Sequence, residues 1–147
     1  MTSPGFEVAF AEAVAGGVEG GIPIGSALEV DGEIVGRGHN RRVQKSSAVL
    51  HGEMDALEDA GRLPARHYRR SIIYTTLSPC SMCTGAILLY RIPKVVIGEN
   101  RSFLGSENLL REHGVEVELV DDQRCVDLMS RFIAENPALW DEDIGED

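Results

Sequence analysis

The spacing of hydrophobic and polar residues predicts that this chain opens with a helix and a hairpin. Apolar side chains in residues 6–18 recur at helical intervals and end at a run of glycines. Residues 26–30 and 33–38 are strand-like runs on either side of Asp31-Gly32, a dipeptide that favours tight hairpin turns. We therefore expect one helix followed by two antiparallel strands.

The rest of the chain predicts strands that alternate with helices. A polar loop is expected over residues 40–47. The helical segments that follow are 48–60, 82–90, 106–113 and 121–135, and the strands are 71–77, 94–98 and 116–120. Alternation of this kind after an initial hairpin predicts an α/β fold, a three-layer α/β/α domain with a mixed sheet of about five strands.

Composition and charge restrict the function. The 147 residues are expected to form one domain, residues 1–147, with 43% hydrophobic and 26% charged residues. No apolar stretch approaches the roughly 20 residues of a membrane span, and the first residues lack a signal-peptide pattern, so we expect no membrane association and a cytoplasmic location. A net charge of −10 disfavours nucleic acid as a partner and favours a small-molecule substrate.

Two short motifs carry the candidate chemistry. His51-Gly52-Glu53 lies near the start of one predicted helix, and Pro79-Cys80-Ser81-Met82-Cys83 lies at the start of another. His51, Cys80 and Cys83 offer three zinc ligands, whereas a structural zinc site normally has four, so a position remains for water. Glu53 is then placed to move protons for that water.

Alternatives from another class remain open at this point. A structural zinc site would need a fourth ligand, which the sequence offers as Cys125, His39, His67 or His113. A thiol redox pair is also compatible with the two motif cysteines, but it gives His51 and Glu53 no role. A third alternative is a protein of the same fold that has lost activity, which the presence of Glu53 disfavours.

The combination of H-x-E with P-C-x-x-C is the signature of zinc deaminases. Beyond this signature, residues 6–145 resemble the small cytosine deaminases of the fungal type, in the cytidine deaminase-like superfamily. The segments that carry the resemblance are Gly21-Ile22-Pro23-Ile24-Gly25, Gly36-Arg37-Gly38-His39-Asn40, Leu50-His51-Gly52-Glu53, Thr75-Thr76-Leu77-Ser78-Pro79-Cys80, Met82-Cys83-Thr84-Gly85-Ala86-Ile87, Trp140 and Asp143-Ile144-Gly145.

The resemblance implies an activity and a set of roles. It implies a homodimer with one catalytic zinc per subunit that hydrolyses free cytosine to uracil and ammonia in pyrimidine salvage. Asn40 and the amide of Gly52 would bind the carbonyl edge of the ring. The Ser78 carbonyl and the Asp143 carboxylate would bind the amine that leaves, and the Cys80 amide would support the developing oxyanion.

The resemblance also implies apolar walls and a lid. The walls would be formed by Ile24, Leu77, Phe103 and Trp140, and residues 136–147 would be a C-terminal lid segment. Two features depart from the family pattern: Val43 replaces a phenylalanine, and the loop around residues 104–106 is shorter. Both departures leave open a related ring such as isocytosine, guanine or creatinine as the substrate.

Overall fold

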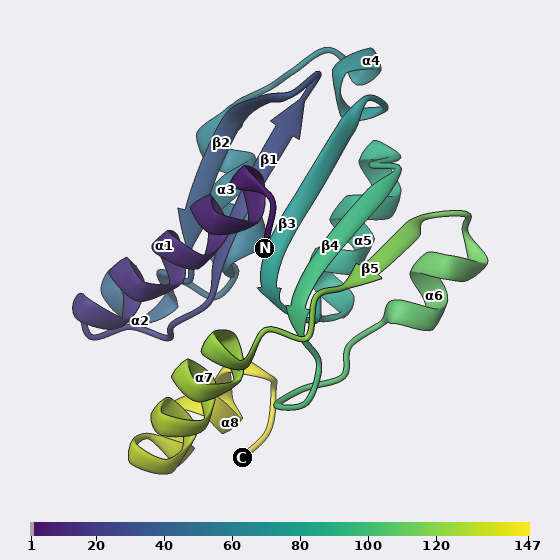
Figure 1. The fold of residues 1–147 in the computed structure, drawn as a ribbon. Coiled ribbons are helices and arrows are strands. Elements are labelled where there is room, and N and C mark those ends of the chain that lie inside the picture. Colours follow the sequence, from purple (N-terminus) through teal and green to yellow (C-terminus); the bar gives the residue numbers. More distant parts are fainter. Residues whose placement is uncertain (1) are drawn as a thin grey trace.

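The structure, a computed structural model, describes residues 2–147 and has a mixed five-stranded sheet at its centre (Figure 1). The strand order is β2-β1-β3-β4-β5. β1 pairs antiparallel with both β2 and β3, whereas β3, β4 and β5 run parallel. The predicted α/β/α domain with a mixed sheet is confirmed.

The predicted helices and strands occur in the predicted order, and the structure adds three short helices that were not predicted, α2, α4 and α8. In chain order, the elements are α1 (Pro4–Val18), β1 (Gly25–Val30), β2 (Glu33–His39), α2 (Arg42–Lys45), α3 (Gly52–Ala60), α4 (Ala65–Tyr68), β3 (Ser71–Leu77), α5 (Ser81–Tyr90), β4 (Lys94–Glu99), α6 (Glu107–Glu112), β5 (Glu116–Leu119), α7 (Gln123–Glu135) and α8 (Pro137–Asp143). None of the helices in residues 2–147 has the length and apolar content to cross a bilayer.

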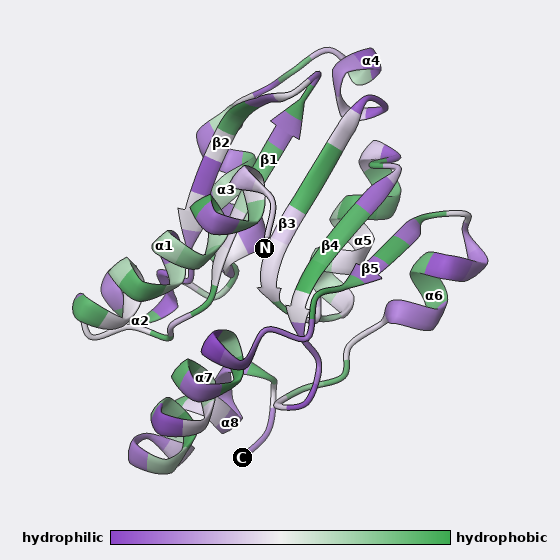
Figure 2. Cartoon of the chain, viewed as in Figure 1, coloured by the Kyte–Doolittle hydropathy of each residue, from purple (hydrophilic) through white to green (hydrophobic). Residues whose placement is uncertain are grey.

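Neighbouring strand residues pack on opposite faces of the sheet because side chains alternate along a strand. Leu28 and Ile73 belong to the core under α5 and α6, whereas their neighbours Ala27 and Tyr74 pack against α1. Figure 1 shows α1 in front of the sheet, α3 and α5 behind it, and α7 below the lower ends of the strands. The central strands are correspondingly the most hydrophobic part of the ribbon in Figure 2.

The predicted helix over residues 48–60 begins later than expected, at Gly52. The preceding chain contains the short helix α2, which ends where Ser46 adopts a left-handed conformation. The Ser47 hydroxyl then accepts hydrogen bonds from the amides of Val49 and Leu50, which stabilises a turn instead of a helix. The predicted loop over residues 40–47 is therefore wrong in part, because it contains α2. Because α3 starts at Gly52, His51 is its N-cap residue.

The C-terminal segment is ordered as a helix that packs near the ends of the parallel strands. Trp140 of α8 is 6% exposed and belongs to an apolar cluster with Ile24, Leu77 and Phe132. Ile24 precedes β1 and Leu77 ends β3. The apolar cluster around Trp140 therefore lies at the carboxyl end of β3, and open α/β sheets bind their ligands at this edge.

Candidate metal centre

Three predicted ligands meet at the N-termini of α3 and α5. His51 is the N-cap residue of α3, and Cys80 is the N-cap residue of α5, directly after β3. Cys83 is fully buried in the first turn of α5. The exposed amides and the dipole at a helix N-terminus favour negative charge, so this position suits cysteine thiolates.

The ligand atoms have the spacing of a tetrahedral zinc site. His51 Nδ1 lies 3.3 Å from Cys80 Sγ and 3.7 Å from Cys83 Sγ, and one ligand atom from each residue lies within 4.8 Å of the others. Tetrahedral zinc with ordinary bond lengths places a sulfur and a nitrogen ligand about 3.6 Å apart. The donor set and its geometry therefore fit zinc.

The four residues considered as a fourth ligand lie elsewhere. Within residues 2–147, the only group of three or more histidine, cysteine or acidic residues with metal-binding spacing is His51, Cys80 and Cys83. Cys125 is buried in the core against α1, and His39 contacts Glu12 and Glu19 through its two ring nitrogens. The site thus offers three protein groups that could hold a metal ion, the number of ligands found in catalytic zinc sites.

Glu53 lies beside the ligands and is only 4% exposed. Burial raises the pKa of its carboxyl group to about 7, because the charged form loses the hydration it has in water. A carboxyl group with a pKa near neutrality can both accept and release a proton at physiological pH. This behaviour matches the proton-transfer role predicted from the H-x-E spacing.

The charges of the three ligands are coupled. A hydrogen bond from Cys83 and another from His51 lower the pKa of Cys80 to about 4. Burial lowers the pKa of His51, but its hydrogen bonds with Asp143 and Cys80 outweigh this effect and raise the pKa to about 10. Cys80 is therefore a thiolate at neutral pH. The hydrogen bond with Cys80 raises the pKa of Cys83, so metal binding releases the protons held on the imidazole and on the Cys83 thiol.

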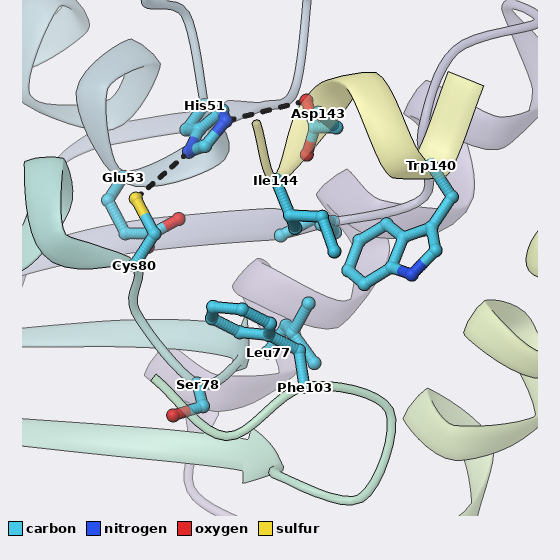
Figure 3. Close-up of a pocket in the computed structure, with 10 residues that line it drawn as sticks. His51, Glu53, Leu77, Ser78, Cys80, Phe103, Trp140, Asp143 and Ile144 are labelled. Carbon is cyan, nitrogen blue, oxygen red and sulfur yellow. Dashed lines mark hydrogen bonds and ion pairs between the residues drawn. The ribbon is translucent and has the colours of Figure 1, made fainter. Parts of the chain in front are cut away.

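A small pocket opens beside the three ligands (Figure 3). Its lining consists of Ile24, His51, Glu53, Leu77, Ser78, Cys80, Phe103, Trp140, Asp143 and Ile144. Figure 3 shows the polar groups His51, Glu53 and Asp143 at one end of the pocket and the rings of Phe103 and Trp140 farther along. The two rings meet edge to face, with centroids 6.2 Å apart.

Asp143 reaches the site from α8 and is held by three other residues. Its Oδ1 atom lies 3.4 Å from His51 Nε2 and accepts hydrogen bonds from Asn40 Nδ2 at 3.1 Å and Arg42 Nη1 at 3.2 Å. Burial raises the pKa of Asp143, but these donors outweigh burial and lower the pKa overall. Asp143 therefore orients the ring of a candidate zinc ligand, and a contact of this kind commonly fixes the tautomer of metal-binding histidines.

Nine of the predicted site residues line this pocket, whereas Asn40, Gly52 and Cys83 do not. The side chain of Asn40 is fully buried behind Asp143, and its Oδ1 accepts a hydrogen bond from the amide of Arg42. Arg42 and Ile144 were not predicted as site residues, but they contribute to the site from α2 and from the residue after α8. Their only sequence signal was their proximity to Asn40 and Asp143.

Comparison with known proteins agrees with this geometry. The family model described as "Cytidine and deoxycytidylate deaminase zinc-binding region" matches residues 5–99, which contain both motifs. The cytosine deaminase of Candida albicans is 60% identical over 143 residues, covering 97% of this chain and 95% of that protein. A tRNA-specific adenosine deaminase of Streptococcus pyogenes is 38% identical over 123 residues, covering 76% of each chain.

Solved structures of deaminases share the fold. A tRNA:A34 deaminase structure has a TM-score of 0.72 at 26% identity and covers 84% of this chain and 97% of its own. A guanine deaminase from Nitrosomonas europaea has a TM-score of 0.69 at 20% identity, covering 91% and 86%, and indicates the fold alone. The three-ligand centre, the neighbouring Glu53 and the match over both motifs lead to one conclusion: this chain belongs to the cytidine and deoxycytidylate deaminase zinc-binding family.

Proposed function

We propose that this protein is a zinc-dependent deaminase that hydrolyses free cytosine to uracil and ammonia. The single observation that carries the proposal is a small pocket in which the zinc ligands and Glu53 face an apolar slot. The slot is lined by Ile24, Leu77, Phe103 and Trp140. A planar base with one amine suits this combination of aromatic walls and a few polar groups. The 60% identity to a fungal cytosine deaminase supports the choice of base.

The chain supplies the groups needed to move protons during the reaction. His51, Cys80 and Cys83 would hold the zinc ion, which would supply Lewis-acid activation of the attacking water. Glu53 takes a proton from that water, delivers it to the ring nitrogen, and carries a second proton to the amine that leaves. One water enters, and the carbon–nitrogen bond to the amine breaks with release of ammonia. The Cys80 amide at the start of α5 supports the oxygen that gains negative charge.

The amine of the base is bound between Ser78 and Asp143. Both residues line the pocket, and the Oδ1 atom of Asp143 is already engaged by protein donors. Its Oδ2 atom is therefore the oxygen available to the amine. Asn40 and the Gly52 amide are the proposed contacts to the carbonyl edge. Asn40 lies behind Asp143, so its Nδ2 group must exchange its bond to Asp143 for one to the base.

Residues 136–147 form a lid that excludes water once the base is bound. Trp140 and Ile144 of this segment line the pocket, and Asp143 contacts a zinc ligand. Excluding water strengthens the electrostatic interactions in the pocket and protects the reaction from competing solvent. Truncation before Trp140 is expected to abolish turnover and leave zinc bound. Full activity in the truncated protein would contradict the lid.

An ammonia-release assay with a panel of substrates tests the proposed base. Cytosine is expected to be the best substrate, compared with isocytosine, guanine, creatinine, cytidine and adenosine. A higher kcat/KM for isocytosine, guanine or creatinine would retain the chemistry and reject the base. Tight, salt-sensitive binding to tRNA or single-stranded DNA would reject the small-molecule assignment, which the net charge of −10 supports.

We also propose that the protein forms a homodimer through the outer faces of α3 and α5. A groove there is lined by Leu57, Leu63, Ala86, Leu89 and Tyr90, among others. Leu89 is 71% exposed and Tyr90 is 41% exposed, so this face carries apolar surface that a second copy would cover. A Leu89→Asp variant is expected to be monomeric in analytical ultracentrifugation. A monomeric wild-type protein would contradict the proposal.

The proposed cellular role is pyrimidine salvage in the cytoplasm. The reducing cytoplasm keeps Cys80 and Cys83 free to bind zinc, since oxidation to a disulfide would remove both ligands. Expression in cells that lack pyrimidine synthesis is expected to permit growth on cytosine, and the Glu53→Ala variant is expected not to. Growth that is independent of Glu53 would refute this role. Cell fractionation tests the location.

A further inference from the structure

Glu107, at the start of α6, is a buried acidic residue that the proposed chemistry does not use. It is 3% exposed and lies on the buried side of α6 with Leu110, whereas Asn108 and Leu109 are exposed. Its Oε2 atom accepts a hydrogen bond of 2.7 Å from the Ser78 hydroxyl. Its Oε1 atom lies 3.4 Å from Asn100 Nδ2 and 3.5 Å from Arg111. Burying an acidic group is costly, so its partners indicate what it contributes.

Ser78 links Glu107 to the pocket. The Ser78 amide donates to the Glu99 carbonyl at 3.0 Å, and its hydroxyl donates to Glu107 and accepts from the Gly105 amide at 2.9 Å. Among residues 2–147, no donor reaches the Ser78 carbonyl. Because the other polar groups of Ser78 are bound within the protein, the carbonyl is the group left for a ligand. Figure 3 shows the hydroxyl pointing away from the pocket, as this arrangement requires.

The same contacts hold the loop of residues 100–106, which carries Phe103. Gly105 binds the Ser78 hydroxyl, and the Ser106 amide donates to the Pro79 carbonyl at 3.1 Å. A Cβ atom at Gly105 would overlap the Pro79 carbonyl oxygen, so the loop lies directly on the segment that leads to Cys80. The beginning of the loop is fixed separately, because the fully buried Glu99 side chain accepts from the amides of Arg101 and Ser102.

We propose that Glu107 is a positioning residue that acts through the Ser78 hydroxyl to hold the Ser78 carbonyl and the Phe103 loop at the pocket. It fixes two walls of the pocket without touching the base. This inference rests on the proposed function for its effect on turnover. Its structural part, the position of Phe103 against Trp140, does not depend on which base is bound.

The test compares Glu107→Ala, Ser78→Ala and the double variant, with Glu112→Ala as the matched control. Glu112 lies in the same helix and is exposed. Ser78→Ala removes only the hydroxyl and keeps the carbonyl. The measurements are zinc content, melting temperature, the emission spectrum of Trp140 and the kcat and KM for cytosine. Trp140 is the only tryptophan and contacts Phe103, so its emission reports on the loop.

Glu107→Ala and Ser78→Ala are each expected to shift Trp140 emission to longer wavelength and to lower kcat/KM by about tenfold, with zinc content unchanged. Both substitutions remove the same hydrogen bond between Glu107 and Ser78. The kcat/KM of the double variant is therefore expected to be no lower than that of the more damaged single variant, whereas two independent effects would multiply to a loss of about a hundredfold. Glu112→Ala is expected to match the wild type in every measurement.

A lower melting temperature with unchanged emission and kcat/KM would overturn the inference, as would losses that multiply in the double variant. If Glu107→Ala does not fold, Ser78→Ala decides alone, and unchanged Trp140 emission in that variant overturns the inference. Failure of the proposed function looks different: the wild type releases no ammonia from cytosine, while the emission shifts still occur.

Discussion

Removal of the Trp140 ring tests how α8 is held over the pocket. Trp140 is 6% exposed and packs with Ile24, Leu77 and Phe132, and its ring also meets Phe103. We predict that Trp140→Ala detaches α8 and leaves the rest of the fold intact. The reason is that a single residue, Asn136, separates α8 from α7, so the position of α8 over the pocket depends on its side-chain contacts.

The free energy that α8 loses in Trp140→Ala follows from the burial of the Trp140 side chain. Replacing a buried tryptophan by alanine costs about 3–5 kcal/mol. Two polar anchors of α8 remain in this variant. Asp143 keeps its contacts with His51, Asn40 and Arg42. Glu142 is 62% exposed, so its ion pair with Arg42 contributes only about 0.5 kcal/mol after solvent screening. A helix of 7 residues has no stability of its own in water. The equilibrium for opening α8 should therefore increase by about a hundredfold or more.

Hydrogen exchange measures this equilibrium directly. The amides of Trp140 and Ile144 are hydrogen-bonded within the segment and should lose protection in Trp140→Ala, while amides of β3 keep theirs. Leu139→Ala is the matched control, because Leu139 lies in the same helix but is 37% exposed. Cytosine turnover should fall in parallel with protection. Unchanged exchange of the two α8 amides in Trp140→Ala would refute the reasoning.

Three further predictions concern the metal, the proton carrier and acid stability. Cys83→Ala should lose zinc on metal analysis, and a full zinc content would remove Cys83 from the ligand set. Glu53→Gln should keep zinc but lose at least about a hundredfold in kcat, the usual contribution of a proton-transfer group; activity within threefold of wild type would contradict its role. Asp122 caps α7, and its hydrogen bonds with Arg124 lower its pKa. Asp122→Ala should therefore cost about 1 kcal/mol at pH 7 in urea unfolding. Because the folded pKa is the lower one, the difference should shrink as the pH falls below about 4; a constant cost would indicate that ionisation of Asp122 plays no part.

The local chemistry of the chain was sufficient to predict most elements. Strand 71–77 was placed at the bounds that the structure shows, because its β-branched and aromatic run ends abruptly at Ser78-Pro79. The helix start at Gly52 was not predicted. Val49 and Leu50 fit the apolar pattern of the helix, but their amides bind the Ser47 hydroxyl. A periodic pattern identifies the buried side of a helix but not the competing hydrogen bonds at its end.

The sequence by itself determined the chemistry of this protein. His51, Glu53, Cys80 and Cys83 could be recognised because each motif places its groups within a few residues, at the start of a helix. Only the tertiary structure decided how that chemistry is enclosed. It brought Asp143 to the ring of His51 and to Asn40, and it buried Glu107 against Ser78. These contacts join residues far apart in the chain, and their distances are set by the packing of α6 and α8 rather than by any local spacing.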